Sequence, residues 1–149
     1  MGYILNIGII GLGLMGGSLA KAVKRYSIAN KVYGFTNSEK NKKDILELNL
    51  VDELVDLETL KKVSDVIILA IPVDAIIGMF PNFLNIDENT TIIDMGSTKE
   101  YIVKNIPKKI RQNFIAAHPM TGTEKSGPKA AIDDLYEGKT VVFCDLEDN

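Results

Sequence analysis

Two stretches of this sequence combine residue types that could do chemistry, and the first is rich in glycine. "GLGLMGG" places Gly11, Gly13 and Gly16 in the spacing G-x-G-x-x-G, directly after the apolar run "YILNIGII". Glycines at these positions permit a tight turn, close approach of a pyrophosphate, and close packing of the helix that follows. The N–H groups at the helix start, including those of Leu14 and Met15, would face the phosphates. We predict that these five residues bind a dinucleotide; a ligand-free strand-to-helix turn is the alternative.

The second stretch, "AAHPMTGTEKSG", contains His118, the only histidine in the chain. It comes after the strand-like run "NFIAA", so we expect His118 to follow a strand directly. An imidazole titrates near neutral pH and can accept or donate a proton there. His118 is therefore a candidate catalytic residue, and a purely structural histidine is the alternative.

Composition restricts the class of protein. The chain has 149 residues, of which 46% are hydrophobic and 25% charged, as in one ordinary folded domain. The net charge of −3, without a basic stripe, argues against a nucleic-acid partner. Glycines interrupt the first apolar run well short of the ~20 residues of a membrane span, and no positive charge precedes it as in a secretory signal. With one cysteine and no internal disulfide, we expect a cytoplasmic protein with no membrane or nucleic-acid partner and no metal.

Strand-like and helix-like segments alternate along the chain. The predicted strands are 3–10, 31–35, 53–55, 65–71, 90–94, 113–117 and 140–144, and the predicted helices are 15–26, 38–48, 57–63, 73–84 with an interruption at Pro81, and 97–109. This alternation predicts an α/β fold of the Rossmann type, with a doubly wound, mostly parallel sheet in one domain, residues 1–149.

Ligands of such a sheet bind at the carboxyl ends of its strands. Thr36, Asn37 and Ser38 follow the second strand, and Ser38 is also a candidate helix cap. Ile71 ends the predicted strand 65–71, and Pro72 begins the loop that follows it. We predict that these residues contact the cofactor.

Ser97 follows the strand 90–94. With Glu100 three residues later it has the spacing of a capping box, which predicts a helix that begins at Ser97. Its place at the ligand edge of the sheet makes it a candidate site residue as well.

The residues after the second strand bear on the choice of cofactor. A site for NAD usually has Asp or Glu there to bind the ribose 2′-hydroxyl. This chain has Thr36, with Lys40 nearby, and small hydroxyl groups beside a lysine would tolerate a 2′-phosphate. We expect NAD or NADP with a slight preference for NADP; the alternative is that these residues form only a turn and a cap.

Five segments in order, "GLGLMGGSLAKAV", "ILAIPVD", "DMGSTK", "AAHPMTGTEKSG" and "LYEGKTVVF", resemble the dinucleotide-binding domain of the prephenate dehydrogenase family of tyrosine biosynthesis. The resemblance covers essentially the whole chain. The glycine loop is common to many oxidoreductases, whereas the histidine loop H-P-M-x-G-T-E-x-S-G is far more specific.

The resemblance implies an oxidative decarboxylation of prephenate to 4-hydroxyphenylpyruvate that depends on NAD or NADP. His118 would accept a hydrogen bond from the C4 hydroxyl of the substrate, and Ser97 would orient both. The pocket for this small dianion would be lined by Gly122, Thr123, Glu124 and Ser126.

The resemblance also implies that the chain is a fragment of a longer enzyme. Family members continue into a helical C-terminal domain that forms a homodimer and supplies an arginine for the substrate carboxylate. Two alternatives stay open: an arogenate dehydrogenase, and a dinucleotide-sensing module without chemistry, which would have no use for His118 and Ser97 together.

Overall fold

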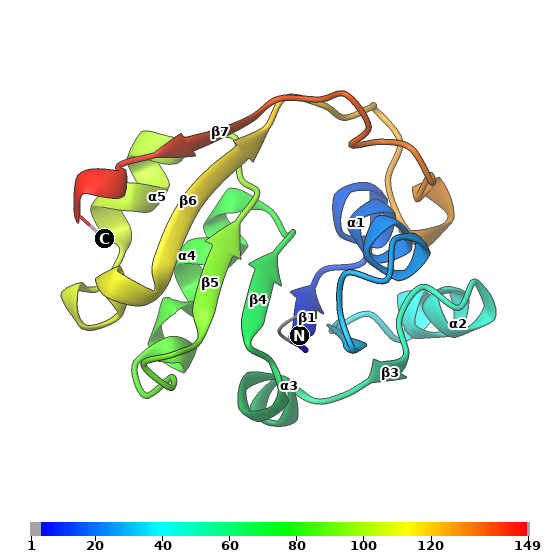
Figure 1. Cartoon of the computed structure of the whole chain (residues 1–149), viewed down its shortest axis with the longest axis horizontal. Coiled ribbons are helices and arrows are strands. Elements are labelled where there is room, and N and C mark those ends of the chain that lie inside the picture. The colour runs from blue at the N-terminus through cyan, green and yellow to red at the C-terminus, as the bar shows by residue number, and fades with distance from the viewer. Residues whose placement is uncertain (1–3, 149) are drawn as a thin grey trace.

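The computed structural model describes residues 4–148, so Tyr3, the first residue of the first predicted strand, lies outside the described part. Figure 1 shows the arrangement of the elements. The strands are β1 (Asn6–Ile10), β2 (Lys31–Phe35), β3 (Glu53–Leu54), β4 (Val66–Leu69), β5 (Thr91–Asp94), β6 (Phe114–Pro119) and β7 (Val141–Cys144). The α-helices are α1 (Leu14–Arg25), α2 (Glu39–Glu47), α3 (Leu57–Val63), α4 (Val73–Met79) and α5 (Lys99–Asn105).

The strands form a seven-stranded sheet in the order β3-β2-β1-β4-β5-β6-β7. Every neighbouring pair is parallel except β6 and β7, which are antiparallel. The chain order reverses between β1 and β4, and such a reversal is where doubly wound sheets bind ligands. The predicted Rossmann-type fold is confirmed.

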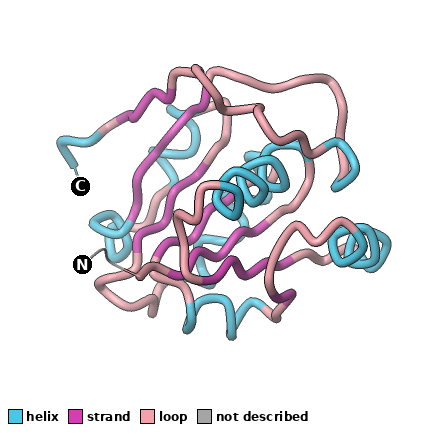
Figure 2. The backbone as a smooth tube through the Cα atoms, turned by 45° about the vertical axis from the view of Figure 1, so that its right-hand side comes forward, coloured by secondary structure: helices cyan, strands magenta, loops and turns pink. Residues whose placement is uncertain are grey.

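Helices cover both faces of the sheet, as the tube in Figure 2 shows. On one face, Ile67, Ile92 and Phe114 pack with residues of α4 and α5. On the other, Ile9 and Val32 pack with residues of α1 and α2. Burial on both faces explains why the strands read as continuous apolar runs.

Prolines shorten two of the predicted helices. Helix α4 gives way after Met79 to a 3₁₀ turn, Phe80–Phe83, that contains Pro81, as predicted. The helix expected to continue to Lys109 ends at Asn105, two residues before Pro107, and a separate 3₁₀ turn covers Lys108–Asn113. Pro81 lacks the N–H that would continue the hydrogen bonding of α4, although Phe80 before it remains helical. Before Pro107, Ile106 is extended with a ψ of 120°, as expected for a residue that precedes proline.

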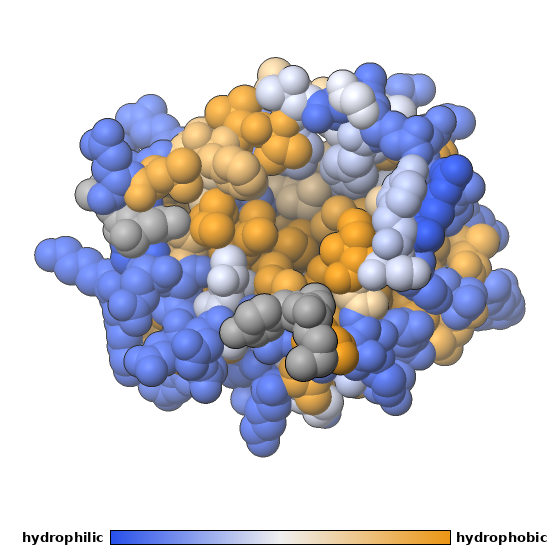
Figure 3. Space-filling model, viewed as in Figure 1, coloured by the Kyte–Doolittle hydropathy of each residue, from blue (hydrophilic) through white to orange (hydrophobic). Residues whose placement is uncertain are grey.

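Apolar side chains gather on the face of the molecule shown in Figure 3. Ile93 and Met95 are only partly buried, and on the edge strand β7 Val141 and Phe143 remain 43% and 54% exposed. Within residues 4–148, no helix has the length and apolar character needed to cross a membrane.

Candidate functional site

The glycine loop after β1 is held by close packing at two of its three positions. Gly11 has a φ of +90°, and a Cβ there would lie 2.4 Å from the carbonyl oxygen of Ala70, which follows β4. A Cβ on Gly16 would lie 1.8 Å from the carbonyl oxygen of Gly11. Only glycine fits at these two positions, so both are required by the fold itself.

Gly13 is different, because the protein leaves room for a side chain there. A Cβ would meet nothing nearer than the amide nitrogen of Gly127, at 3.6 Å, and its φ of −89° is ordinary. The first hydrogen bond of α1 runs from the N–H of Gly17 to the carbonyl of Gly13, at 2.8 Å. The N–H groups of the preceding turn, including those of Leu14 and Met15, therefore have no acceptor within the helix. An open backbone beside these amides fits a pyrophosphate.

The predicted adenosine side lies beside this loop. The N–H of Gly11 donates to the carbonyl of Phe35 at the end of β2 (3.2 Å). Thr36 Oγ1 accepts from the N–H of Ser38 (3.2 Å), and Ser38 Oγ accepts from the N–H of Asn41 (3.2 Å). The predicted cap of α2 is confirmed, and the first carboxylate after β2 belongs to Glu39, which pairs with Lys42.

The other predicted cofactor residues lie at the same sheet edge, but β4 ends at Leu69, so Ile71 follows the strand and does not lie within it as predicted. A Cβ on Gly11 would meet the side chain of Ile71 at 2.7 Å, so the segment after β4 packs on the glycine loop. Pro72 is exposed and precedes the first residue of α4. Asn37 is exposed in the turn between β2 and α2.

His118 lies within β6, not after a strand as predicted. β5 pairs with β6 only as far as Ala116, and β7 then provides partners for the next residues, including Val142 opposite His118. The antiparallel partner therefore prolongs the strand. The side chain is half-buried, and its Nδ1 is buried without a hydrogen-bond partner among the described residues. A buried ring nitrogen without a partner is unusual in a folded protein and calls for a specific explanation, of which a catalytic role is one.

Asp94, the last residue of β5, connects the two predicted catalytic positions. Its carboxylate is fully buried and accepts hydrogen bonds from the N–H of Gly96 (2.9 Å) and of Ala117 (3.3 Å). These amides belong to the residue before Ser97 and the residue before His118. The ammonium of Lys99 also donates to Asp94, and burial lowers the pKa of Lys99 although Asp94 opposes that shift.

The capping box predicted at Ser97 and Glu100 is wrong. Helix α5 begins at Lys99, its N-cap is Thr98 without a side-chain hydrogen bond, and Glu100 pairs with Lys104 at 2.6 Å. The ion pair with Asp94 draws Lys99 toward the strand end, and Ser97 is left exposed in the turn before the helix. Its hydroxyl is thus accessible at the edge where His118 lies.

The predicted pocket residues come from the segment between β6 and β7. Gly122, Thr123, Glu124 and Ser126 are all exposed. A Cβ on Gly122 would lie 4.0 Å from Met15 Sδ, so this segment approaches the glycine loop. Thr123 Oγ1 accepts from the N–H of Lys125 (3.1 Å), and no hydrogen bond or ion pair within residues 4–148 joins Glu124 to His118 or Ser97. The structure brings the segment to the cofactor edge without closing it on the histidine.

Three residues of this edge were missed by the sequence reasoning: Asp94, Lys99 and Tyr136. For Asp94 a signal was present, since a carboxylate that ends an apolar strand must find partners. Tyr136 reaches the site through a contact between distant parts of the chain, for which the local sequence holds no pattern.

Residues 19–149 match the family model described as "Prephenate dehydrogenase, nucleotide-binding domain". The chain belongs to this family. Among curated relatives of the prephenate dehydrogenase family, the prephenate dehydrogenase of Bacillus subtilis is 33% identical over 135 residues, 87% of this chain but 36% of the relative. The cyclohexadienyl dehydrogenase of Zymomonas mobilis is 32% identical over 144 residues, 93% of this chain and 48% of the relative.

Solved structures agree with this assignment to the prephenate dehydrogenase family. A structure of Aquifex aeolicus prephenate dehydrogenase with hydroxyphenyl propionate and NAD⁺ matches with a TM-score of 0.90 and 30% identity, over 99% of this chain and 52% of that one. Synechocystis arogenate dehydrogenase matches with a TM-score of 0.81 and 26% identity, over 93% of this chain and 49% of that one. The chain thus spans about half the length of these relatives or less.

Proposed function

We propose that this chain is the dinucleotide-binding domain of a longer prephenate dehydrogenase, an enzyme that oxidises and decarboxylates prephenate with NAD or NADP. The observation that carries the proposal is His118, whose Nδ1 is buried and unpartnered at the same sheet edge as the open backbone of Gly13. Family membership supports the same reaction, because the chain matches the nucleotide-binding domain of these dehydrogenases.

In the proposed reaction His118 is the proton-handling group. The bound dinucleotide supplies the nicotinamide that accepts a hydride from C4 of the substrate. His118 accepts a hydrogen bond from the C4 hydroxyl and stabilises the positive charge that develops as the hydride leaves. The ring carboxylate departs as carbon dioxide, and its bonding electrons complete the aromatic ring, so the C4 oxygen ends as a phenol. Ser97, from the adjacent turn, orients this hydroxyl.

Asp94 supports this arrangement from within the protein. Its bonds to the amides of Gly96 and Ala117 fix the backbone on either side of the proposed site. Gly122, Thr123, Glu124 and Ser126 are proposed to complete the substrate pocket when a second domain and the substrate are present. Their exposure in the isolated domain fits that role.

For the cofactor we propose that NADP binds at least as well as NAD. Thr36 stands where NAD-selective sites place a carboxylate, and the next carboxylate along the chain, on Glu39, is 84% exposed and paired with Lys42. The proposed cofactor residues are Gly11, Gly13, Leu14, Met15, Gly16, Thr36, Asn37, Ser38, Ile71 and Pro72. NAD⁺ in the Aquifex aeolicus structure supports dinucleotide binding at this fold but does not decide this preference.

We further propose that the full enzyme has a second domain, forms a homodimer through that domain and is cytoplasmic. The partly exposed Met95 and the 54% exposed Phe143 provide apolar surface that a further domain could cover. Arogenate, the amino-acid form of the substrate, is a second candidate because the Synechocystis arogenate dehydrogenase shares this fold closely.

The test is the steady-state kinetics of the full enzyme with His118→Asn. We expect kcat to fall by about 10²–10⁴, the usual weight of a positioned acid–base group, with dinucleotide affinity nearly unchanged. The fall of kcat at acidic pH, which reports protonation of the imidazole, should be absent in this variant. Assays with prephenate and with arogenate separate the two substrates. A variant that kept most of its kcat and the same fall of kcat at acidic pH would show that His118 is structural.

A further inference from the structure

The segment between β6 and β7, residues 120–140, lies across the end of α1. Figure 1 shows it leaving β6, passing to α1 and returning to β7. We call the part of this segment up to Ser126 the first limb, and it carries the proposed substrate residues, Gly122 to Ser126. The part after Ser126 is the second limb, which packs on α1 through Leu135 and Tyr136. Segments that approach a cofactor site in this way can couple one ligand to another.

Two partly buried hydrogen bonds attach the second limb to α1. The hydroxyl of Tyr136 donates to the carbonyl oxygen of Met15 at 2.7 Å, and the N–H of Ile132 donates to Ser18 Oγ at 2.9 Å. Met15 belongs to the first turn of α1, whose amides are available for phosphate. Ser18 is fully buried, whereas Ile132 is exposed, so this contact is partly shielded from water.

The Tyr136 hydroxyl also reaches the end of β5. It lies 4.0 Å from Sδ of Met95, the residue that follows Asp94. One phenol thus touches both the glycine loop after β1 and the strand end next to Ser97, on either side of β4 in the sheet.

A further bond ties the two limbs to each other. The hydroxyl of Thr121 donates to the carbonyl of Leu135 at 3.1 Å. Thr121 directly precedes Gly122, and Leu135 directly precedes Tyr136. A continuous path therefore runs from Met15 through Tyr136, Leu135 and Thr121 to the proposed substrate residues.

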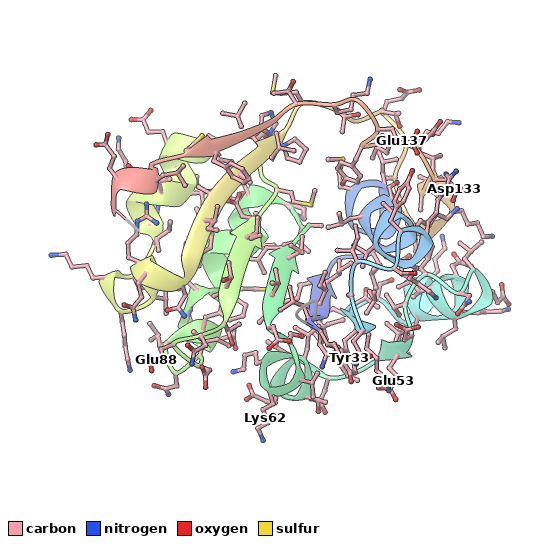
Figure 4. All side chains as sticks on the ribbon, in the orientation of Figure 1. Tyr33, Glu53, Lys62, Glu88, Asp133 and Glu137 are labelled. Atoms are coloured by element: carbon pink, nitrogen blue, oxygen red, sulfur yellow. The ribbon has the colours of Figure 1, made fainter. Side chains whose placement is uncertain are left out.

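Separate contacts hold the same limb from outside. Lys21 pairs with Asp133 at 3.5 Å, and the hydroxyl of Tyr26 donates to Glu137 at 2.6 Å. Figure 4 shows Asp133 and Glu137 beside α1, on the outer side of the molecule. Tyr26, Asp133 and Glu137 are exposed, and neither contact involves the glycine loop, so they provide a matched control for the inner contact.

We propose that Tyr136 is a positioning residue that links the dinucleotide site to the substrate-binding limb of segment 120–140. Its hydroxyl fixes the peptide of Met15, and with it the first turn of α1, while its neighbour Leu135 holds Thr121. Binding of the dinucleotide to that turn then orders the limb that carries Thr123 and Glu124. The inference rests on the proposed dinucleotide binding.

The experiment compares wild type, Tyr136→Phe and Tyr26→Phe of this chain. Hydrogen exchange measures the protection of backbone amides, and calorimetry measures dinucleotide affinity. Without ligand, we expect amides of the 128–136 stretch to exchange about fivefold faster in Tyr136→Phe, as for one lost hydrogen bond, and no such change in that stretch for Tyr26→Phe. Circular dichroism and a cooperative thermal transition check that each variant is folded.

With NAD, or NADP where that binds more tightly, wild type and Tyr26→Phe should gain protection both in the glycine loop and in 120–126. Tyr136→Phe should bind about five- to tenfold more weakly and keep protection only in the glycine loop. Equal effects of the two tyrosine variants, or wild-type protection of 120–126 in Tyr136→Phe, would overturn the coupling while leaving the proposed function intact. Absence of any dinucleotide binding by wild type would contradict the proposed function itself.

Discussion

Asp94 and Lys99 form a buried ion pair between the end of β5 and the first residue of α5. The Asp94 side chain is fully buried and that of Lys99 is 12% exposed. The same carboxylate accepts hydrogen bonds from the backbone on either side of the proposed site, at Gly96 and Ala117. Removal of the charge should therefore affect both folding and the geometry around Ser97 and His118.

We expect Asp94→Asn to lower the free energy of unfolding by about 3–5 kcal/mol, because Lys99 would stay buried without a counter-charge. The double variant Asp94→Asn/Lys99→Met should recover much of that loss. Urea unfolding measures both. As a control, Glu39→Gln breaks the exposed pair with Lys42 and should cost no more than ~1 kcal/mol. Equal costs for Asp94→Asn and Glu39→Gln would mean that burial does not govern this pair.

Ser97→Ala should leave the stability of the domain within about 0.5 kcal/mol of wild type, since Ser97 is exposed and does not cap α5. In the full enzyme, the same change should lower kcat. Thermal unfolding and kinetics measured side by side check this pair of expectations. Ser38, the confirmed N-cap of α2, serves as the comparison, because Ser38→Ala should lower the free energy of unfolding by about 1 kcal/mol. A comparable loss in Ser97→Ala would indicate a capping role after all.

The free energy of unfolding at alkaline pH should depend on Tyr136. Burial raises the pKa of its phenol above the usual 10.0, so the unfolded chain releases this proton at lower pH than the folded chain does. The stability that the neutral phenol contributes is complete below that ordinary pKa and is lost as the pH rises above it.

The wild-type advantage over Tyr136→Phe in urea unfolding should therefore be constant up to a pH of about 10 and shrink above it. Because every other titrating group is common to both proteins, the difference isolates Tyr136. An advantage that stayed constant across the alkaline range would show that this phenol ionises equally in both states.

Cofactor preference should respond to Thr36. We expect wild type to bind NADP at least as tightly as NAD, and Thr36→Asp to shift the ratio toward NAD by about ten- to a hundredfold through repulsion of the 2′-phosphate. Gln112→Glu adds a negative charge at an exposed position before β6 and should not change the ratio. Calorimetric titration with each dinucleotide measures the ratio of the two affinities. A wild-type preference for NAD of more than about a hundredfold would refute the proposed tolerance.

The parts of the fold that could be predicted from the sequence are those with local signals. The spacing of Gly11, Gly13 and Gly16 predicted the strand–turn–helix, because Gly11 and Gly16 meet their steric constraints within a few residues or at the adjacent strand. The alternation of apolar runs and amphipathic segments predicted the sheet and its helices, and Ser38 was recognised as a cap.

What could not be predicted depends on contacts between distant residues. His118 lies inside a strand because β7 pairs with it, and periodicity around the histidine carries no trace of that partner. The sequence around Ser97 fits a capping box, but Lys99 forms a buried ion pair with Asp94 and α5 begins at Lys99. The contact between Tyr136 and Met15 joins residues 121 positions apart, beyond the reach of any local pattern.

The central claim, that a dinucleotide lies against the glycine loop, is tested most directly by calorimetric titration of NAD and NADP into wild type and Gly13→Ala. The protein has room for this methyl group, with its nearest neighbour at 3.6 Å, so the variant should fold with a wild-type thermal transition. Gly16→Ala, whose Cβ would lie 1.8 Å from the Gly11 carbonyl, should instead be unfolded or strongly destabilised. We predict that wild type binds at least one dinucleotide and that folded Gly13→Ala binds it at least about tenfold more weakly. Equal affinity in a folded Gly13→Ala, or no binding by wild type, would contradict the account.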